Sequence, residues 1–354
     1  MEETAPPSTE ERAGRLRGRI GVVLNPNARK NRRRPGRVAA LRAIVGEHGV
    51  VHETPSLEAL RSTLRELVSE GASYLVSDGG DGALNWMYNE LEALSTGDGH
   101  GSLPPLMPTN SGTIDFVAAK VGLRGNAERI VHALVRRMAE GRPPEVVELD
   151  SLLVEGEQEL PNGQRVPFRR VGFAAAVGGI GQRFFDKYYR IPDPGAASIV
   201  RVVAAAVASQ ALGAVPGPWP ERWLSYAREL FAPTRATVAL DGMELPTTAH
   251  GAIHAGSFDV NLGGVFRVFP LARERRVLHL QAGAIPPWQI VRNIPRLCRG
   301  ETIRSDSLWE RAGCEMAVRA TGEELLRPVL DGEVFTGIRA LTIRPGPPVR
   351  IARV

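Results

Sequence analysis

The residues with the clearest chemical potential form one glycine-rich turn, Gly79-Gly80-Asp81-Gly82. The turn follows the short apolar run 74–76 and precedes an apolar pattern at helical spacing that begins at Leu84, which predicts a strand, a turn and a helix. Glycine lets a backbone approach a ligand and take positive φ, and amide N–H groups at a helix start attract anions. Asp81 beside a polyphosphate would require Mg²⁺ or a proton between the two negative groups. The turn therefore predicts a phosphate and Mg²⁺ site; the alternative is an ordinary strand-to-helix turn that Asp81 caps.

Two further turns carry polar residues that could contact a nucleotide. Asn25-Pro26-Asn27 ends the apolar run Ile20–Leu24, and Ser111-Gly112-Thr113 follows a short strand predicted over 105–107. Helices are predicted over 57–68 and 126–140. Strands that alternate with helices indicate a parallel sheet, whose ligands bind at the carboxyl ends of the strands. We therefore expect the turns at Asn25 and Gly79 to meet at one edge. Ser111, Gly112 and Thr113 form a second glycine turn before a helix and are expected to hydrogen-bond phosphate or ribose.

A basic loop follows the first of these turns. Its positive residues are Arg29, Lys30, Arg32, Arg33, Arg34 and Arg37. A solvated basic loop is the favoured interpretation. The alternative is a loop that attracts an anionic membrane or contacts the phosphates of ATP.

A pair of carboxylates stands near the end of the chain, in Asp331-Gly332-Glu333. An Asp-Gly pair is a common hairpin turn, and Asp241-Gly242 is predicted to be only that. The position of Asp331 and Glu333 at the end of an otherwise apolar strand makes this second turn the chemical candidate.

The run from Gly79 to Leu91, Gly-Gly-Asp-Gly-x-Leu-Asn-x-x-x-Asn-x-Leu, resembles the nucleotide-binding signature of the diacylglycerol kinase and sphingosine kinase superfamily. Asn85 and Asn89 lie one helical turn apart, and this pair resembles the lipid-kinase branch, because NAD kinases and phosphofructokinases share only the glycine part. Three residues depart from the pattern: Ala83 replaces the usual Thr, Trp86 the usual Glu and Glu90 the usual Gly.

Three other elements are similar to that family. The Asn-Pro turn at Asn25 resembles its opening turn, and Gly112-Thr113 resembles its Gly-Thr-x-Asn element, with Asp115 where Asn is usual. Asp331 to Glu333 resembles its carboxylate element. The resemblance implies that Asp331 is the base for the lipid hydroxyl and that Asp81 and Glu333 help to hold Mg²⁺. Asp81 is the rival base, because the sphingosine-kinase branch assigns that role to the Asp of the glycine turn.

The resemblance also implies the architecture: an α/β nucleotide-binding domain with a Rossmann-like parallel sheet, followed by a β-sandwich, with both substrates in the cleft between them. We expect a disordered tail over 1–17, the first domain over 18–143 and the sandwich over 144–354, with the last strand as a candidate to pack back on the first domain. Short strands separated by Gly, Pro and Asn support the second part. They are predicted over 146–149, 151–154, 236–240, 251–254, 265–269, 277–281, 315–320 and 338–343.

Composition sets wider limits. A chain of 354 residues with 43% hydrophobic and 23% charged residues is typical of two globular domains. Cys298 and Cys314 fit a reducing compartment, and no signal peptide is expected, so the predicted location is cytoplasmic with peripheral membrane contact. The Ala- and Val-rich stretch 196–215 predicts a packed helix; the alternative is that it and Trp219 or Trp223 admit a lipid tail or touch the bilayer.

The predicted function is transfer of the γ-phosphoryl group of ATP, with Mg²⁺, to a hydroxyl of a lipid alcohol such as diacylglycerol or a sphingoid or ceramide-like lipid. Asn25, Pro26, Asn27, Gly79, Gly80, Gly82, Asn85, Ser111, Gly112 and Thr113 are the predicted nucleotide-binding residues. A nucleotide- or lipid-binding homologue that has lost catalysis is the first alternative, and a kinase for a soluble substrate, akin to NAD kinase, is the second. Nucleic-acid binding has only the basic loop in its favour, and the sequence does not indicate an oligomeric state.

Overall fold

A computed structural model describes residues 19–98 and 103–354, so the predicted tail over 1–17 lies outside the described residues. The chain forms two compact units. The first runs to Leu149 and also contains Val349–Val354, and the second is Asp150–Pro348.

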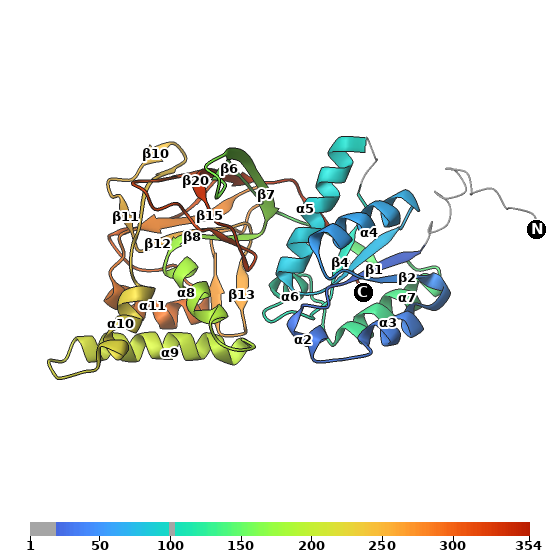
Figure 1. The fold of residues 1–354 in the computed structure, drawn as a ribbon, viewed down its shortest axis with the longest axis horizontal. Helices are drawn as coiled ribbons and strands as arrows, with labels where there is room; N and C mark the ends of the chain where they lie inside the picture. The colour runs from blue at the N-terminus through green and yellow to red at the C-terminus, as the bar shows by residue number, and fades with distance from the viewer. Residues whose placement is uncertain (1–18, 99–102) are drawn as a thin grey trace, which may run out of the picture. The chain divides into compact units, whose positions relative to one another are not determined.

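A six-stranded sheet in the order β2-β1-β3-β4-β21-β5 forms the centre of the first unit (Figure 1). Its strands are β1 (Ile20–Leu24), β2 (Gly49–Glu53), β3 (Tyr74–Asp78), β4 (Leu106–Pro108), β5 (Glu145–Leu149) and β21 (Val349–Arg353). All neighbours run parallel except β5, which is antiparallel to β21. Strand β1 is buried along its whole length, as expected of a parallel strand covered on both faces.

Helices cover both faces of this sheet, with α4 and α5 on one side and α3 and α7 on the other (Figure 1). The helices are α2 (Arg29–Arg32), α3 (Arg37–Val45), α4 (Leu57–Ser69), α5 (Asp81–Asp98), α6 (Phe116–Lys120) and α7 (Ala127–Ala139). A short 3₁₀ turn, η1 (Gly46–His48), follows α3. Ser56 and Asn126 cap α4 and α7 by accepting backbone N–H bonds. The α/β fold with a mainly parallel sheet is confirmed.

The boundary between the units differs from the predicted 143/144. Residues 146–149 were expected in the sandwich, yet β5 pairs with β21 in the sheet of the first unit, Val147 lying opposite Ile351. A short alternating strand carries no sign of which sheet it joins, because its partner is distant in sequence. The final strand therefore belongs to the first unit, and the second unit is a continuous insertion before it.

The second unit is built from antiparallel strands. One sheet has the order β10-β9-β17-β20-β6-β7, with β11 also paired to β9; another has the order β16-β15-β12-β8-β18-β19; β13 and β14 form a separate hairpin. The strands of the first sheet are β6 (Leu152–Glu159), β7 (Arg165–Gly172), β9 (Thr234–Leu240), β10 (Met243–Glu244), β11 (Ala249–His250), β17 (Met316–Ala320) and β20 (Ile338–Pro345). The others are β8 (Ala174–Gly179), β12 (Ala252–Gly256), β13 (Val260–Leu262), β14 (Phe266–Val268), β15 (Leu278–Gly283), β16 (Leu308–Gly313), β18 (Val329–Leu330) and β19 (Glu333–Val334). The predicted antiparallel architecture is confirmed.

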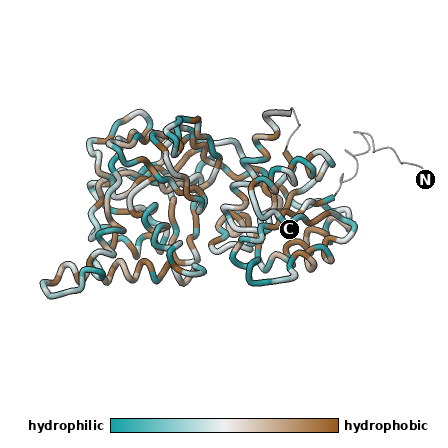
Figure 2. Tube along the Cα trace, in the orientation of Figure 1, coloured by the Kyte–Doolittle hydropathy of each residue, from teal (hydrophilic) through white to brown (hydrophobic). Residues whose placement is uncertain are grey.

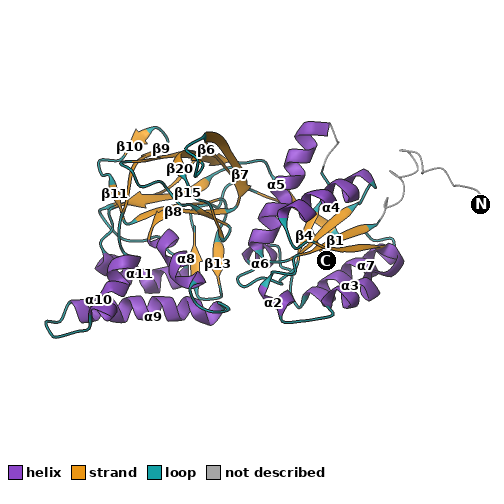
Figure 3. Ribbon diagram, in the orientation of Figure 1, coloured by secondary structure: helices purple, strands orange, loops and turns teal. Residues whose placement is uncertain are grey.

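Four helices gather on one side of these strands (Figure 3). They are α8 (Ile180–Tyr189), α9 (Ala196–Gly213), α10 (Glu221–Leu230) and α11 (Pro287–Arg299). Helix α9 packs through Ile199, Val202, Ala206 and Ser209 and leaves apolar residues such as Val200 exposed. Figure 2 colours the chain by the hydropathy of each residue, and much of the α9 trace is apolar. Among the described residues, α9 is the one helix long and apolar enough by length and composition to cross a membrane, and 22% of it is buried.

Candidate active-site elements

Three turns meet at the carboxyl edge of the parallel sheet; the meeting of the Asn25 and Gly79 turns was predicted, and the turn at Ser111 joins them. Leu24 lies opposite Asp78 in the register of β1 and β3, so the turns that begin at Asn25 and Gly79 are neighbours. The Asn25 N–H donates to the Asp78 carbonyl at 3.1 Å. On the other side, Ser77 of β3 lies opposite Pro108 of β4, which brings in the turn at Ser111.

The two glycine turns touch backbone to backbone. A Cβ atom on Gly80 would lie 2.9 Å from Cα of Gly112, and one on Gly112 would come closer still to Gly80. Only glycine permits this approach. Gly79, Gly80 and Gly112 do not take positive φ, so that part of the prediction was wrong: these glycines are needed for space. Because no residue of the turn takes positive φ, the helix can begin earlier than expected, at Asp81 instead of Leu84.

One buried carboxylate, Asp78, ties the turns together. Arg37 of α3 donates to it through Nε at 2.8 Å and Nη2 at 3.0 Å, and the two side chains are 4% and 0% exposed. The hydroxyls of Thr109 and Ser111 donate to Asp78 Oδ1 at 2.8 and 2.5 Å. Burial alone would lower the pKa of Arg37, but the Asp78 carboxylate raises it above its ordinary value. We call Arg37, Asp78, Thr109 and Ser111 the Asp78 clamp.

The basic loop contributes to this edge from outside. Asn31 donates to the carbonyls of Asn25 and Asp78, at 2.9 Å each. Lys30 pairs with Asp115 at 3.0 Å, and Asp115 Oδ1 also accepts the Gly112 N–H at 2.8 Å. Burial raises the pKa of Asp115, and the Lys30 charge offsets part of that rise. The favoured interpretation of a solvated loop therefore holds for the exposed Arg32, Arg33 and Arg34 but is wrong for Arg37.

The Asp81 carboxylate lies against a second helix. Its Oδ2 accepts the Phe116 N–H at 3.1 Å and its Oδ1 accepts the Val117 N–H at 3.0 Å, in the first turn of α6. Asp81 therefore caps α6, a helix distant in sequence from the one that Asp81 begins. Asp81 thereby joins the turn after β3 to the element that carries Asp115 and Gly112.

The asparagine pair lies on one buried face of α5, as its spacing predicts. Asn89 Nδ2 donates to the Asn85 carbonyl at 2.8 Å, and the two residues are 8% and 3% exposed. Glu90, which replaces a Gly of the signature, accepts two bonds from Arg61 of α4 at 2.7 and 3.0 Å. That departure therefore forms an ion pair between helices and leaves the glycine turn unchanged.

In the second unit, Asp331 and Gly332 form the tight turn between β18 and β19. Both have positive φ, 49° and 89°. The buried Asp331 carboxylate accepts the N–H groups of Phe173 and Ala174 at the start of β8, at 2.9 to 3.1 Å. Glu333 is the first residue of β19 and is partly exposed.

An aromatic helix end borders this turn. The Tyr189 hydroxyl, at the end of α8, donates to the Gly332 carbonyl at 2.5 Å. Phe184, Phe185, Tyr188 and Tyr189 pack against one another at this helix end, with Phe184 and Tyr188 stacked and the other pairs tilted or edge to face. The sequence analysis assigned Tyr189 no role beside Asp331. Tyr189 is the last residue of α8, directly before the helix cap Arg190.

Sequence reasoning also missed Asp78 and the function of Arg37. The available signal was an Asp directly after a buried strand, next to the glycine turn. Burial of one arginine from a run of six basic residues leaves no mark in the sequence.

Residues 19–142, which contain all three turns of the first unit, match the family model of the diacylglycerol kinase catalytic domain. This segment belongs to the diacylglycerol kinase catalytic domain family. No curated protein gives a significant match to the chain.

Solved structures extend the likeness in fold to both units. A Bacillus anthracis strain Sterne protein described as a diacylglycerol kinase is 12% identical with a TM-score of 0.56, covering 95% of this chain and 97% of that one. A second from the same strain, described as a candidate diacylglycerol kinase, is 13% identical with a TM-score of 0.60, covering 93% and 94%. At this identity the likeness shows a shared fold from the kinase domain through the antiparallel unit.

Proposed function

We propose that the chain is an ATP-dependent lipid kinase that transfers the γ-phosphoryl group to the hydroxyl of a lipid alcohol, either diacylglycerol or a sphingoid or ceramide-like lipid. The observation that carries the proposal is the contact of two glycine turns at the carboxyl edge of a kinase-family sheet, held by the Asp78 clamp. Phosphoryl transfer requires mainly charge stabilisation and positioning, which rigid backbone N–H groups supply.

In this proposal the first unit binds the nucleotide. Backbone at Gly79, Gly80, Gly82, Gly112 and Thr113 follows the phosphates, since a Cβ atom at Gly80 or Gly112 would block the turns. The Ser111 hydroxyl is buried in the clamp, so its contribution is to position the turn. Asn25 acts in the same way: its Oδ1 accepts the Asn27 N–H at 2.9 Å and thereby shapes the turn through Pro26. Asn85 supports helix α5, which follows the first glycine turn, because its carbonyl accepts the Asn89 side-chain amide.

Asp331 supplies the proton acceptor for the lipid hydroxyl. A general base needs a fixed carboxylate, and the two backbone N–H groups at Phe173 and Ala174 hold this one. Asp81 is the rival for this role. Its oxygens face the first turn of α6, where the helix dipole stabilises a negative charge.

The carboxylates present fit Mg²⁺ brought by ATP. Among residues 19–98 and 103–354, no group of three or more His, Cys, Asp or Glu side chains could hold a metal by itself. Mg²⁺ commonly uses one or two carboxylates together with substrate phosphates, so such a cluster is not required. Asp81 is the side chain of the first unit that would hold the ion, and the ion would there offset charge on the phosphates. Glu333 is the corresponding candidate of the second unit.

A lipid substrate also implies membrane contact. We propose a cytoplasmic protein with peripheral contact to anionic membrane, supported by the exposed apolar side of α9, with Val200 48% exposed, and by Trp223 of α10, 45% exposed. The exposed Arg32, Arg33 and Arg34 supply positive charge in the first unit.

A second candidate is a nucleotide- or lipid-binding homologue without catalysis. One specific observation favours it: Asp81 and Asp331 both accept backbone N–H bonds from neighbouring segments, which a purely structural residue would also do. Ala83 in place of Thr points the same way.

The deciding experiment incubates purified protein with radiolabelled ATP, Mg²⁺ and a panel of lipid alcohols in mixed micelles. Labelled lipid phosphate supports the kinase. Thermal stabilisation by ATP and Mg²⁺ without transfer to any lipid supports the binding homologue, and labelled NADP from NAD would contradict both.

The clamp provides a sharper test of the nucleotide half. Thr109→Val removes one hydroxyl bond to Asp78 and should lower the free energy of unfolding by about 1 kcal/mol. Because the clamp positions both glycine turns, we expect the KM for ATP to rise several-fold while the KM for lipid stays constant. Thr54→Val is the matched control, since the Thr54 hydroxyl donates to the Leu24 carbonyl at 3.3 Å and, within the described part of the chain, to no residue of the clamp. An equal rise in the KM for ATP in both variants would contradict a role specific to the clamp.

A further inference from the structure

One segment of the second unit carries a large excess of positive charge. Residues 267–304 contain eight arginines and two glutamates, with no lysine or aspartate, and this excess is larger than the net charge of +5 of the whole chain. The segment runs from β14 through β15 and α11 into the loop before β16. Such a concentration favours an anionic partner.

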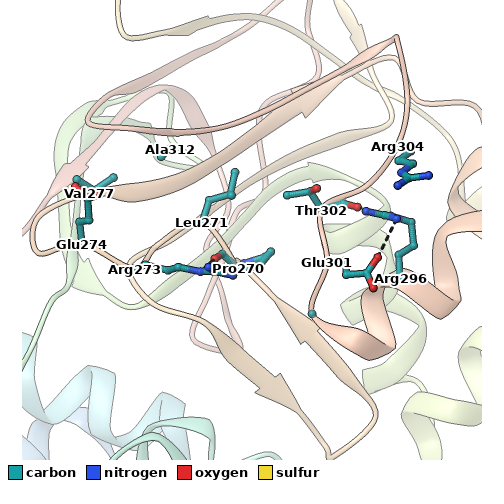
Figure 4. Close-up of a pocket in the computed structure, with 11 residues that line it drawn as sticks. Pro270, Leu271, Arg273, Glu274, Val277, Arg296, Glu301, Thr302, Arg304 and Ala312 are labelled. Carbon is teal, nitrogen blue, oxygen red and sulfur yellow. Dashed lines mark hydrogen bonds and ion pairs between the residues drawn. The ribbon is translucent and has the colours of Figure 1, made fainter.

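Within this segment lies an open pocket of about 500 Å³ (Figure 4). Three arginines line it, Arg273 after β14, Arg296 on α11 and Arg304 beyond α11. Figure 4 shows Arg296 and Arg304 at one end and Glu274 at the other. Glu301 is therefore the acidic residue that could directly neutralise the positive charge at the end of the pocket with Arg296 and Arg304.

Glu301 is already engaged. Its Oε2 pairs with Arg296 at 2.8 Å and its Oε1 with Arg299 at 2.6 Å. Arg273 and Arg304 form no ion pair with a carboxylate of the described chain, and Arg273 uses only its Nε, which donates to the Pro270 carbonyl at 2.8 Å. Two guanidinium groups thus present positive charge to the pocket.

A buried pair beneath the pocket sets its shape. His279 Nε2 lies 3.3 Å from Glu310 Oε1, and these side chains are 1% and 6% exposed. His279 Nδ1 accepts the Leu271 N–H at 3.3 Å, and Glu310 Oε2 accepts the Ile303 N–H at 2.6 Å. The two walls that carry Arg273 and Arg304 are therefore fixed to one polar pair in the sheet.

We propose that this pocket binds the phosphate group of an anionic ligand through Arg273 and Arg304, with Arg296 as the third cation. Planar guanidinium groups bind phosphate oxygens by paired N–H bonds. The phosphate can come from a soluble phosphomonoester or from a lipid headgroup. The headgroup source has its own structural basis, because α11 exposes Trp288 (54%) and Arg292 one turn apart on its outer face. The site belongs to the second unit alone and does not depend on the proposed kinase activity.

The test compares Arg273→Gln/Arg304→Gln with a control of equal charge, Arg65→Gln/Arg124→Gln, in the full chain. Arg65 and Arg124 are exposed and, among the described residues, form no ion pair. Calorimetry at low ionic strength measures binding of inorganic phosphate and glycerol 3-phosphate, and sedimentation measures binding to phosphatidylcholine vesicles with and without phosphatidic acid. The pocket variant should bind at least about tenfold more weakly than the wild type or the control. Arg273→Lys/Arg304→Lys, which keeps the charge, should retain part of the binding.

Each result either supports or overturns the proposed phosphate site. Loss of soluble phosphate binding in the pocket variant alone supports a free phosphomonoester, and loss of vesicle binding alone supports a headgroup. Equal loss in the pocket and control variants would mean a general charge effect and overturn the proposal. No binding of any probe by the wild type would overturn it as well. Unfolding temperatures of all variants should match, because Arg296, Glu301 and the buried pair are unchanged.

Discussion

Asp331-Gly332 and Asp241-Gly242 are two copies of one local structure in the second unit. Each joins two antiparallel strands, and each has positive φ at both residues: 49° and 89° in the first, 47° and 80° in the second. Each Asp carboxylate accepts two backbone N–H groups from a neighbouring segment, Phe173 and Ala174 in the first and Cys314 and Glu315 in the second. The Asp-Gly sequence thus explains the turn and the cap equally well in both places.

The surroundings separate the two copies. Asp241 is exposed and pairs with Arg311, whereas Asp331 is buried and its turn is bonded by Tyr189. The Arg311 charge offsets that of the Asp241 carboxylate, while the Tyr189 hydroxyl fixes the turn that carries Asp331. The comparison teaches that backbone geometry alone does not indicate chemistry; the neighbours of the carboxylate do.

The largest expected difference is in catalysis. Asp331→Asn should lower kcat at least about 100-fold, the range for loss of a general base, while Asp241→Asn leaves kcat unchanged. Both should lose a similar free energy of unfolding, about 1 to 2 kcal/mol, because each weakens one two-bond cap. Steady-state kinetics and urea unfolding of the two variants measure this. Equal kcat values for Asp331→Asn and Asp241→Asn would contradict the claim that the two Asp-Gly turns differ in their role in catalysis.

The glycines test the shared part of the comparison. Gly332→Ala and Gly242→Ala each force a Cβ into the left-handed region, at about 1 to 2 kcal/mol of stability. At Gly332 the new Cβ would also lie 3.1 Å from the Tyr189 hydroxyl, while nothing lies within 4 Å at Gly242. We expect Gly332→Ala to be the less stable variant in thermal unfolding. If Gly242→Ala unfolded first, steric surroundings would not be what distinguishes the two turns.

Tyr189→Phe sharpens the difference because it removes the hydroxyl that bonds the Gly332 carbonyl. We expect a loss of about 1 kcal/mol in stability and a several-fold lower kcat, since the turn that holds Asp331 becomes looser. Tyr226→Phe on α10 is the control, with no change in kcat. An unchanged kcat in Tyr189→Phe would show that the aromatic border does not position Asp331.

The smallest effect concerns acid stability. Burial opposes ionisation of Asp241, but the Cys314 N–H, the Arg311 side chain and the Glu315 N–H together lower its pKa below the ordinary 3.8. A lowered carboxyl pKa contributes stability above the unfolded value, and this is lost as pH falls through the folded value. The free energy of unfolding of the wild type should therefore fall more steeply below about pH 4 than that of Asp241→Asn. Parallel profiles in urea titrations would contradict this assignment.

The sequence predicted the parts of the fold that depend on local pattern. Apolar runs located β1, β3 and β4, and capped amphipathic stripes located α4 and α7 almost to the residue. The meeting of the Asn25 and Gly79 turns followed from their position at one sheet edge, whereas the contact of Gly80 with Gly112 was not predicted. Strand β5 was placed in the wrong unit and α10 and α11 were not predicted, because Pro at both starts and short amphipathic stretches among strands obscure the pattern. The buried Arg37–Asp78 pair depends on tertiary packing, which a single basic loop does not reveal.

The central claim is that the chain transfers phosphate from ATP to a lipid alcohol with Asp331 as the proton acceptor. The most direct test is one measurement of ³²P transfer to the lipid panel by wild type, Asp331→Asn and Asp241→Asn under identical conditions. The account predicts labelled lipid with wild type and Asp241→Asn and almost none with Asp331→Asn, while all three bind ATP. Equal transfer by the two variants, or no transfer by wild type to any lipid, would contradict it.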